Sequence, residues 1–179
     1  MKTEADMQHG FDWTGTDPAG WLVSEKMDGC RAYWDGFQFW TRSGRKIAAP
    51  ESITRGLPAI HLDGEFWAGR GRFTEARLAV NHGKWTSRVR FVVFDSPKAP
   101  GDWMQRIESA RAMGVECVRW WACDSGEELL RDLDRIVSAG GEGLMIHKPG
   151  GLYRPGRAWT LQKVKPAIVA RLYKTEATK

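Results

Sequence analysis

The sequence is poor in the features that mark secreted and membrane proteins. It has three cysteines, Cys30, Cys117 and Cys123, and their spacing fits neither a disulfide framework nor a zinc site. No apolar run approaches the roughly 20 residues of a membrane-spanning helix, and residues 1–6 contain no apolar segment of the kind found in signal peptides. These absences predict a cytoplasmic protein in a reducing compartment, with no membrane partner.

Acidic residues are outnumbered, although not by many. Lysine and arginine together number 27 against 22 aspartates and glutamates, which gives a net charge of +5. A basic surface raises the local concentration of polyanions, so nucleotides or nucleic acid are favoured partners; a mildly basic protein without such a partner is the alternative. The 179 residues, 42% of them hydrophobic, are enough to bury one sizeable core, and a single domain is expected.

The most informative stretch is 24–31, where one lysine precedes an acidic-glycine turn and an arginine. Residues 21–26 are predicted to form a strand that ends at Asp28 and Gly29, because glycine tolerates the positive φ of a sharp reversal. This places Lys26 at the floor of a cleft. A lysine is nucleophilic only as the neutral amine, which desolvation or a neighbouring cation such as Arg31 favours. A surface hairpin with a solvated lysine is the alternative.

Apolar and aromatic runs predict strands joined by short helices over most of the chain. Residues 1–19 are polar and rich in turn formers, which predicts a loosely packed lead-in. Two aromatic runs flank Asp35 and Gly36, a strong hairpin signal. A short helix or turn is expected within 50–58. Further strands are predicted at 60–67, 90–95, 115–121, 142–148 and 161–165, and further helices at 74–81, 102–113 and 126–139.

Several charged residues suit a nucleotide. Lys163 and Lys165 alternate across one residue, which predicts both amines on one face of the last strand, where two cations would attract an anion. Glu142, at the start of a predicted buried strand, is placed to hold a divalent metal or a sugar hydroxyl. The glycine-arginine stretch at 69–72 lacks the lysine-serine ending of a P-loop. Solvated lysines on an edge strand and a charge at a helix end are the alternatives.

Six segments, taken in order, resemble the signature motifs of the covalent nucleotidyltransferases, the superfamily to which ATP-dependent DNA ligases belong. They are KMDGCR at 26–31, TRSG at 41–44, LDGE at 62–65, FVVFD at 91–95, EGLM at 142–145 and LQKVK at 161–165. Within the superfamily, DGEFWAGRGRF at 63–73, GGEGLM at 140–145 and LYRPGR at 152–157 resemble the minimal bacterial ligases of the Lig E type. The order and spacing of the motifs, over residues 21–166, carry this resemblance.

The resemblance implies an α+β fold, a covalent nucleotidyltransferase (ATP-grasp-like) domain over residues 1–179 with mostly antiparallel sheets around a nucleotide cleft. Small ligases of the family continue into an oligonucleotide-binding barrel, which is expected to be absent here. Residues 167–179 would then be a linker or the start of that missing domain, with a first strand at 167–173.

It also implies an activity, that of an ATP-dependent DNA ligase adenylation domain. Lys26 would take AMP from ATP as a lysyl-adenylate and pass it to the 5′-phosphate of nicked duplex DNA for sealing, in DNA repair or replication. The implied cofactors are ATP and Mg²⁺, and a monomer is expected. The alternatives are an RNA ligase or capping-type nucleotidyltransferase, and a non-catalytic nucleotide- or DNA-binding remnant.

The resemblance also assigns roles to the matching residues. Arg31 and Glu65 would hold the ribose, and Phe94 would stack on adenine. Lys26 is the implied nucleophile, and Glu142 would help to hold the metal. Arg42 would contact phosphate, while Lys163 and Lys165 would neutralise the α-phosphate. The residues expected to contact DNA phosphates are Arg42, Arg45, Lys46, Arg70, Arg72, Arg154 and Arg157.

Overall fold

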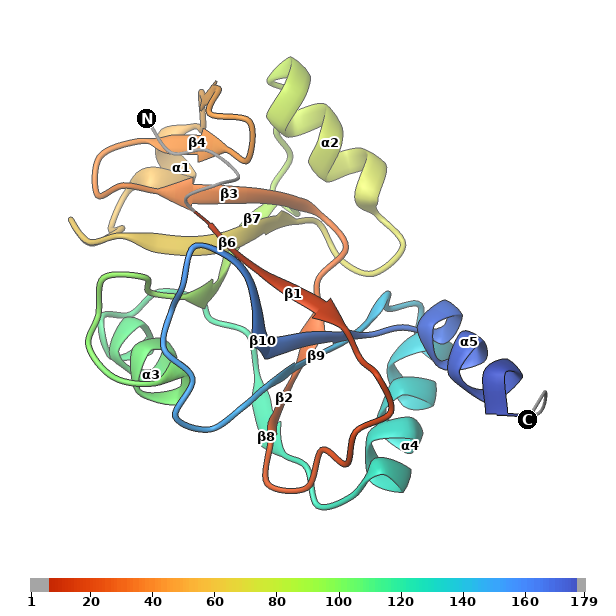
Figure 1. Ribbon diagram of the computed structural model, residues 1–179. Helices are drawn as coiled ribbons and strands as arrows, with labels where there is room; N and C mark the ends of the chain where they lie inside the picture. The colour runs from red at the N-terminus through yellow and green to blue at the C-terminus, as the bar shows by residue number, and fades with distance from the viewer. Residues whose placement is uncertain (1–6, 177–179) are drawn as a thin grey trace.

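The computed structural model describes residues 7–176, in which two five-stranded sheets lie beside five helices (Figure 1). One sheet has the order β1-β10-β9-β2-β8, with β1 Gln8–Asp12, β10 Gly156–Val164, β9 Gly143–His147, β2 Leu22–Lys26 and β8 Trp120–Ala122. The other has the order β5-β4-β3-β6-β7, with β5 Lys46–Ile47, β4 Phe39–Thr41, β3 Cys30–Trp34, β6 Leu62–Trp67 and β7 Arg90–Asp95. The helices are α1 Glu51–Thr54, α2 Phe73–His82, α3 Trp103–Ala112, α4 Gly126–Ser138 and α5 Pro166–Glu176.

Strand pairing within the described sheets is antiparallel except between β1 and β10, which are parallel. The α+β fold with mostly antiparallel sheets is therefore confirmed. The chain passes from the first sheet to the second between β2 and β3, through Met27, Asp28 and Gly29. Lys26 thus ends the last strand before the crossover, at a point where side chains from both sheets can meet.

Each sheet has its own apolar cluster. Phe39, Phe66 and Phe91 meet in the second sheet with ring centroids 4.7 to 5.5 Å apart, and residues of α2 and α3 complete that cluster. In the first sheet, α4 supplies Leu129, Leu133 and Ile136, which pack with residues of β9. The helical spacing of these three residues predicted this buried stripe. Two cores, one for each sheet, leave the residues between the sheets available for a site.

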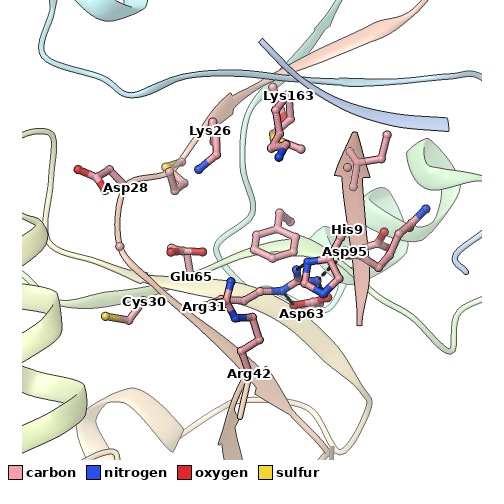
Figure 2. Close-up of a pocket in the computed structure, with 18 of the residues that line it drawn as sticks. His9, Lys26, Asp28, Cys30, Arg31, Arg42, Asp63, Glu65, Asp95 and Lys163 are labelled. Carbon is pink, nitrogen blue, oxygen red and sulfur yellow. Dashed lines mark hydrogen bonds and ion pairs between the residues drawn. The ribbon is translucent and has the colours of Figure 1, made fainter. Parts of the chain in front are cut away.

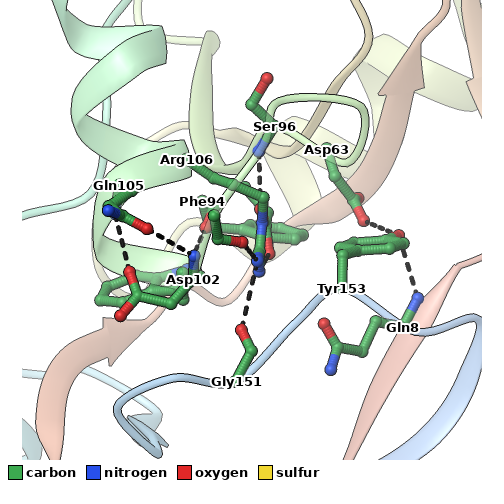
Figure 3. Close-up of polar contacts among 12 residues, drawn as sticks. Gln8, Asp63, Phe94, Ser96, Asp102, Gln105, Arg106, Gly151 and Tyr153 are labelled. Atoms are coloured by element: carbon green, nitrogen blue, oxygen red, sulfur yellow. Dashed lines mark hydrogen bonds and ion pairs between the residues drawn. The ribbon is translucent and has the colours of Figure 1, made fainter.

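Local signals predicted several elements correctly. The aromatic hairpin forms, with the Asp35 side chain accepting hydrogen bonds from the backbone N–H groups of Phe37 and Gln38. Helix α3 begins at Trp103, and Asp102 caps it as expected by forming a capping box with Gln105 (Figure 3). Helices α2 and α4 lie within a residue of their predicted bounds at each end.

Three expectations about the chain are wrong. The described part of the lead-in is not loose, because β1 pairs with β10 and Met7 is fully buried. Residues 167–173, expected to form a strand, lie in α5. Pro166 is preorganised for a first helical position, and apolar residues of the helix pack on the apolar cluster of the first sheet. The strand expected at 115–121 is shortened to β8, with a single bridge between Val93 and Cys117 before it.

None of the described helices is both long and apolar enough to cross a membrane.

Candidate active site

A cleft of about 1170 Å³ is lined by residues of both sheets (Figure 2). In Figure 2, Lys26 and Lys163 lie on one side, and Glu65, Arg31 and Arg42 lie opposite them. The predicted site residues that line the cleft are Lys26, Arg31, Arg42, Arg45, Glu65, Phe94, Glu142, Arg157 and Lys163. Those outside its lining are Lys46, Arg70, Arg72, Arg154 and Lys165. The cleft thus gathers the implied nucleotide-binding residues except Lys165, and most of the implied DNA contacts lie outside its lining.

The crossover after Lys26 depends on Gly29 for a reason that differs from the expected one. Gly29 is not among the glycines with positive φ. A Cβ at this position would lie 2.2 Å from the carbonyl oxygen of Phe66 and 2.9 Å from a side-chain carbon of Glu65. The glycine is needed because the crossover passes directly against β6, which brings Lys26 and Glu65 to the same cleft.

Glu142 joins two lysines. Its Oε2 lies 2.5 Å from Nζ of Lys26 and its Oε1 lies 2.6 Å from Nζ of Lys165. Burial favours the neutral carboxyl, but the hydrogen bonds from Lys165 and Lys26 outweigh it and lower the pKa of Glu142. Lys163 contacts a different carboxylate, with Nζ 2.9 Å from Oδ1 of Asp12. The two lysines therefore contact different carboxylates. Lys163 lines the cleft, whereas Lys165 contacts Glu142, which lines it.

Arg31 is held by a carboxylate that the sequence analysis did not assign. Its Nε and Nη2 donate to the two oxygens of Asp63 at 3.0 and 2.6 Å, and the Asp63 side chain is fully buried. Nη2 also donates to the backbone oxygen of Gln8 at 2.8 Å. The guanidinium lies 5.2 Å from the ring centroid of Phe94. Asp63 therefore holds Arg31 in place beside Phe94.

Tyr153 continues this network from the loop before β10 (Figure 3). Its hydroxyl donates to Oδ2 of Asp63 at 2.9 Å and accepts the Gln8 N–H at 3.0 Å. Burial, followed by the charge of Asp63, raises the pKa of Tyr153 and keeps it a hydrogen-bond donor. Strand β1 and this loop therefore fix Asp63, which in turn fixes Arg31 beside Phe94. A period-two alternation places Asp63 on the same face of β6 as Glu65, the one signal that pointed to it.

The carboxyl of Glu65 stays protonated at pH values at which most carboxyls are ionised. Burial raises its pKa from 4.5 to about 8, although Lys26 and Arg31 oppose the shift. Among the described residues, no hydrogen bond to this carboxyl is found. Below about pH 8, Glu65 therefore presents a neutral carboxyl group that can both donate and accept a hydrogen bond.

This shift predicts a pH-dependent stability. Between about pH 5 and pH 8 the folded chain holds a proton on Glu65 that the unfolded chain releases, so the wild-type chain should lose stability as the pH rises. Glu65→Gln carries no titrating proton there and should lose less. The measured quantity is the melting temperature of the variant minus that of the wild type. This difference should be roughly 5 °C larger at pH 8.5 than at pH 5. If the melting temperatures of the two proteins changed by the same amount across this pH range, Glu65 would not be held neutral.

The cleft wall also contains His147, which the sequence analysis did not single out. Its ring stacks on Trp103 with centroids 3.5 Å apart, and its Nε2 lies 3.1 Å from Oγ of Ser24. Burial, together with the smaller effect of the charge of Arg106, lowers the pKa of His147 to about 3. This part of the wall is therefore flat and uncharged at neutral pH.

The outer basic residues have varied surroundings. Arg70 forms a two-pronged ion pair with Glu25, at 2.8 and 2.7 Å, and Arg72 pairs with Glu75 at 3.4 Å. Arg45 donates to Oδ1 of Asn81 at 2.8 Å. The expected DNA contacts that are exposed are Arg42, Arg45, Lys46, Arg72, Arg154 and Arg157.

No family model matches the chain. A DNA ligase of Haemophilus influenzae is 28% identical over 157 residues, which cover 83% of this chain and 59% of that ligase. The chain thus spans about three-fifths of this relative. A solved structure from a structure-function analysis of Lig E DNA ligases is 32% identical, with a TM-score of 0.80, and the match covers 89% of this chain and 68% of that one. Chlorella virus DNA ligase-adenylate, at 22% identity and a TM-score of 0.76 over 91% of this chain and 68% of its own, shares the fold.

These matches agree with the arrangement of the cleft, in which the six motif segments meet between two sheets. The Lig E structure exceeds 30% identity and is matched over more than two-thirds of its length. The chain belongs to the Lig E DNA ligases and has their nucleotidyltransferase fold.

Proposed function

We propose that this chain is the adenylating domain of an ATP-dependent DNA ligase. The single observation that carries the proposal is the position of Lys26, which ends β2 inside the cleft and faces Glu65 while its amine contacts Glu142. A solvated hairpin lysine, the alternative from the sequence, would have neither a cleft nor a carboxylate partner.

The first step would join AMP to the lysine. The neutral Lys26 amine attacks the α-phosphorus of ATP, a P–N bond forms, and the bond to the leaving pyrophosphate oxygen breaks with its electron pair. Glu142, at 2.5 Å, would orient the amine, and the proton that must leave the ammonium would pass to water. Lys163 in the cleft wall and Lys165 beside Glu142 would stabilise charge on the α-phosphate.

Sealing would follow in two transfers. A 5′-phosphate oxygen of nicked duplex DNA attacks the same phosphorus, which breaks the P–N bond and returns the lysine. The 3′-hydroxyl then attacks the 5′-phosphate, and AMP leaves. The cations around the cleft, with Arg42 and Arg45 in its lining, would position the DNA phosphates.

The nucleotide itself would be held by the opposite wall. The neutral carboxyl of Glu65 suits a ribose hydroxyl, because it can donate as well as accept. Arg31, locked by Asp63, lies next to Phe94, and the place of that ring in the cleft lining supports stacking on adenine. This division of roles remains a proposal for each residue.

Mg²⁺ fits this site as an ion held mainly by the substrate phosphates, with a single protein carboxylate. The described residues contain no group of three or more His, Cys, Asp or Glu side chains that could hold a metal, and both oxygens of Glu142 contact ammonium groups. Mg²⁺ commonly binds through substrate phosphates and one or two carboxylates. When bound, it would supply charge neutralisation at the phosphates. Glu142 is the carboxylate we propose for it.

Replacement of the two glutamates should separate their roles. Glu142→Ala is expected to raise the Mg²⁺ concentration for half-maximal lysyl-AMP formation several-fold, because it removes the proposed protein ligand. Glu65→Ala should instead raise the KM for ATP and leave the Mg²⁺ dependence nearly unchanged. Titration of Mg²⁺ at saturating ATP measures the first effect, and titration of ATP at saturating Mg²⁺ measures the second. Equal losses that do not depend on Mg²⁺ would mean that the two residues act structurally.

Incubation with radiolabelled nucleotides tests the proposed activity. We expect a denaturation-resistant label from ATP in the presence of Mg²⁺, little from GTP, and transfer of that label to a nicked DNA duplex. A label from GTP would favour a capping-type enzyme, and transfer only to nicked RNA would favour an RNA ligase. The absence of any label would favour a non-catalytic remnant.

A monomeric state and a cytoplasmic location are also proposed, and the three free cysteines support the cytoplasmic location.

A further inference from the structure

Two aromatic rings stack on the outside of the molecule without belonging to either core. The rings of Phe11, in β1, and Trp159, in β10, have centroids 3.9 Å apart and are within 6° of parallel. Trp159 is 58% exposed, and neither residue is part of the two apolar clusters. The guanidinium of Arg157 lies 5.7 Å from the Phe11 centroid. We call these three residues the aromatic platform.

The platform is continuous with the cleft. Residues 158, 162 and 164 of β10 are buried, whereas 157, 159, 161 and 163 are more exposed. Arg157 belongs both to the platform and to the lining of the cleft, and so joins the two. The pairing of β1 with β10 shifts register between Gly10 and Phe11, from Ala158 to Gln162, and Trp159 lies in the inserted stretch.

The chain segment that carries Arg157 and Trp159 is rich in cations. No aspartate or glutamate occurs between Glu142 and Glu176 in the sequence. Asp12 pairs with Lys163 and Arg171, but no described carboxylate pairs with Arg154 or Arg157. The cations of this acid-free stretch are Lys148, Arg154, Arg157, Lys163, Lys165, Arg171 and Lys174. Arg154 and Arg157 therefore offer positive charge to a polyanion.

We propose that the aromatic platform binds single-stranded DNA, by stacking an unpaired base on the exposed face of Trp159 while Arg157 and Arg154 contact the phosphates. An exposed aromatic ring beside cations matches the way in which single strands are bound without sequence preference. In a duplex the base faces are covered, so the occupant is an unpaired stretch, such as an overhang beside a break. The choice of DNA rests on the proposed ligase function.

Equilibrium binding to two DNAs tests this site. One is a labelled single-stranded oligonucleotide, and the other is a duplex of similar length closed by loops too short to expose a free base, both followed by fluorescence anisotropy at fixed salt. Trp159→Ala should weaken binding of the single strand on the order of ten-fold and leave binding of the closed duplex within about two-fold. Trp159→Phe, which keeps a ring, should restore most of the affinity.

Phe37→Ala is the matched control, because Phe37 is 84% exposed at the tip of the aromatic hairpin, in the other sheet. It should leave both affinities unchanged. Equal weakening of both DNAs by Trp159→Ala, or no weakening of either, would overturn the proposal. A change in oligomeric state with no change in DNA binding would also overturn it and would identify a second copy of the chain as the occupant.

Lysyl-AMP formation from ATP in the same preparations keeps the two proposals separate. A wild-type chain that takes up no AMP but binds single strands through Trp159 would refute the ligase function alone. A chain that takes up AMP but binds single strands equally with and without Trp159 would refute the platform alone.

Discussion

Lys26→Ala is expected to take up no covalent AMP from ATP, with a signal at background where the wild type is labelled. The substitution removes the attacking nitrogen, and loss of a covalent nucleophile typically costs several orders of magnitude in rate. The fold should survive, because the Lys26 and Glu142 side chains are partly exposed and their ion pair contributes only about 1 kcal/mol or less. Label on the denatured chain and the melting temperature measure the two effects.

Two further variants make this result specific. Lys26→Arg keeps a positive charge opposite Glu142 but supplies no amine of suitable reactivity, so it should also remain unlabelled. Lys84→Ala removes an exposed lysine just after α2 and should be labelled like the wild type. Label retained by Lys26→Ala would refute the assignment of the nucleophile.

Arg106→Ala is expected to cause the largest loss of stability. Arg106 is 2% exposed; it contacts both oxygens of Asp95 at 2.7 and 2.9 Å and donates to the backbone oxygens of Gly101 and Gly151 (Figure 3). Its removal leaves a buried carboxylate without its partner, which typically costs 3–5 kcal/mol, about 10 °C in a domain of this size. Thermal unfolding at pH 7 measures the change.

The matched control and a double variant distinguish this cause from general damage. Arg131→Ala, on the exposed face of α4, breaks only a long surface ion pair of 3.9 Å and should shift the melting temperature by about 1 °C or less. Replacing both buried partners, as in Asp95→Leu with Arg106→Met, should recover part of the loss, because no charge is then left unpaired. A double variant no more stable than Arg106→Ala would contradict the buried-charge explanation.

The position of Arg106 also connects stability to the site. Asp95 directly follows Phe94 in β7, and Gly151 lies two residues before Tyr153, whose hydroxyl holds Asp63. Loss of Arg106 should therefore disturb both the ring proposed to stack on adenine and the carboxylate that fixes Arg31. We expect the KM for ATP to rise in any folded Arg106 variant.

The sequence predicted those parts of the fold that depend on neighbours along the chain. The hairpin at Asp35, the capping box at Asp102 and the apolar stripe of α4 are local patterns, and each forms as expected. Strand β1 was missed because its partner, β10, lies near the other end of the chain and its own residues show no alternation. Helix α5 was missed because a family comparison suggested a barrel strand, whereas Pro166 and the apolar spacing favour a helix.

The residues of the site that belong to sequence motifs were predicted, but the residues that orient them were not. Motif residues such as Lys26, Glu65 and Glu142 meet in one cleft, as the resemblance implied. The residues that orient them were not found, because their contacts span long separations: Tyr153 is 90 residues from Asp63 and 145 from Gln8. Asp63 could have been found from its alternation with Glu65, but nothing in the sequence indicated that it would pair with Arg31.

The most direct test of the central claim is to locate AMP on the chain. The wild-type protein is incubated with ATP and Mg²⁺, digested, and its peptides are analysed by mass spectrometry for the added nucleotide. We predict AMP on the peptide containing Lys26, attached to Nζ, and none on the peptides containing Lys163 or Lys165. AMP on another lysine, or an unmodified chain under conditions in which a Lig E ligase is labelled, would contradict the account.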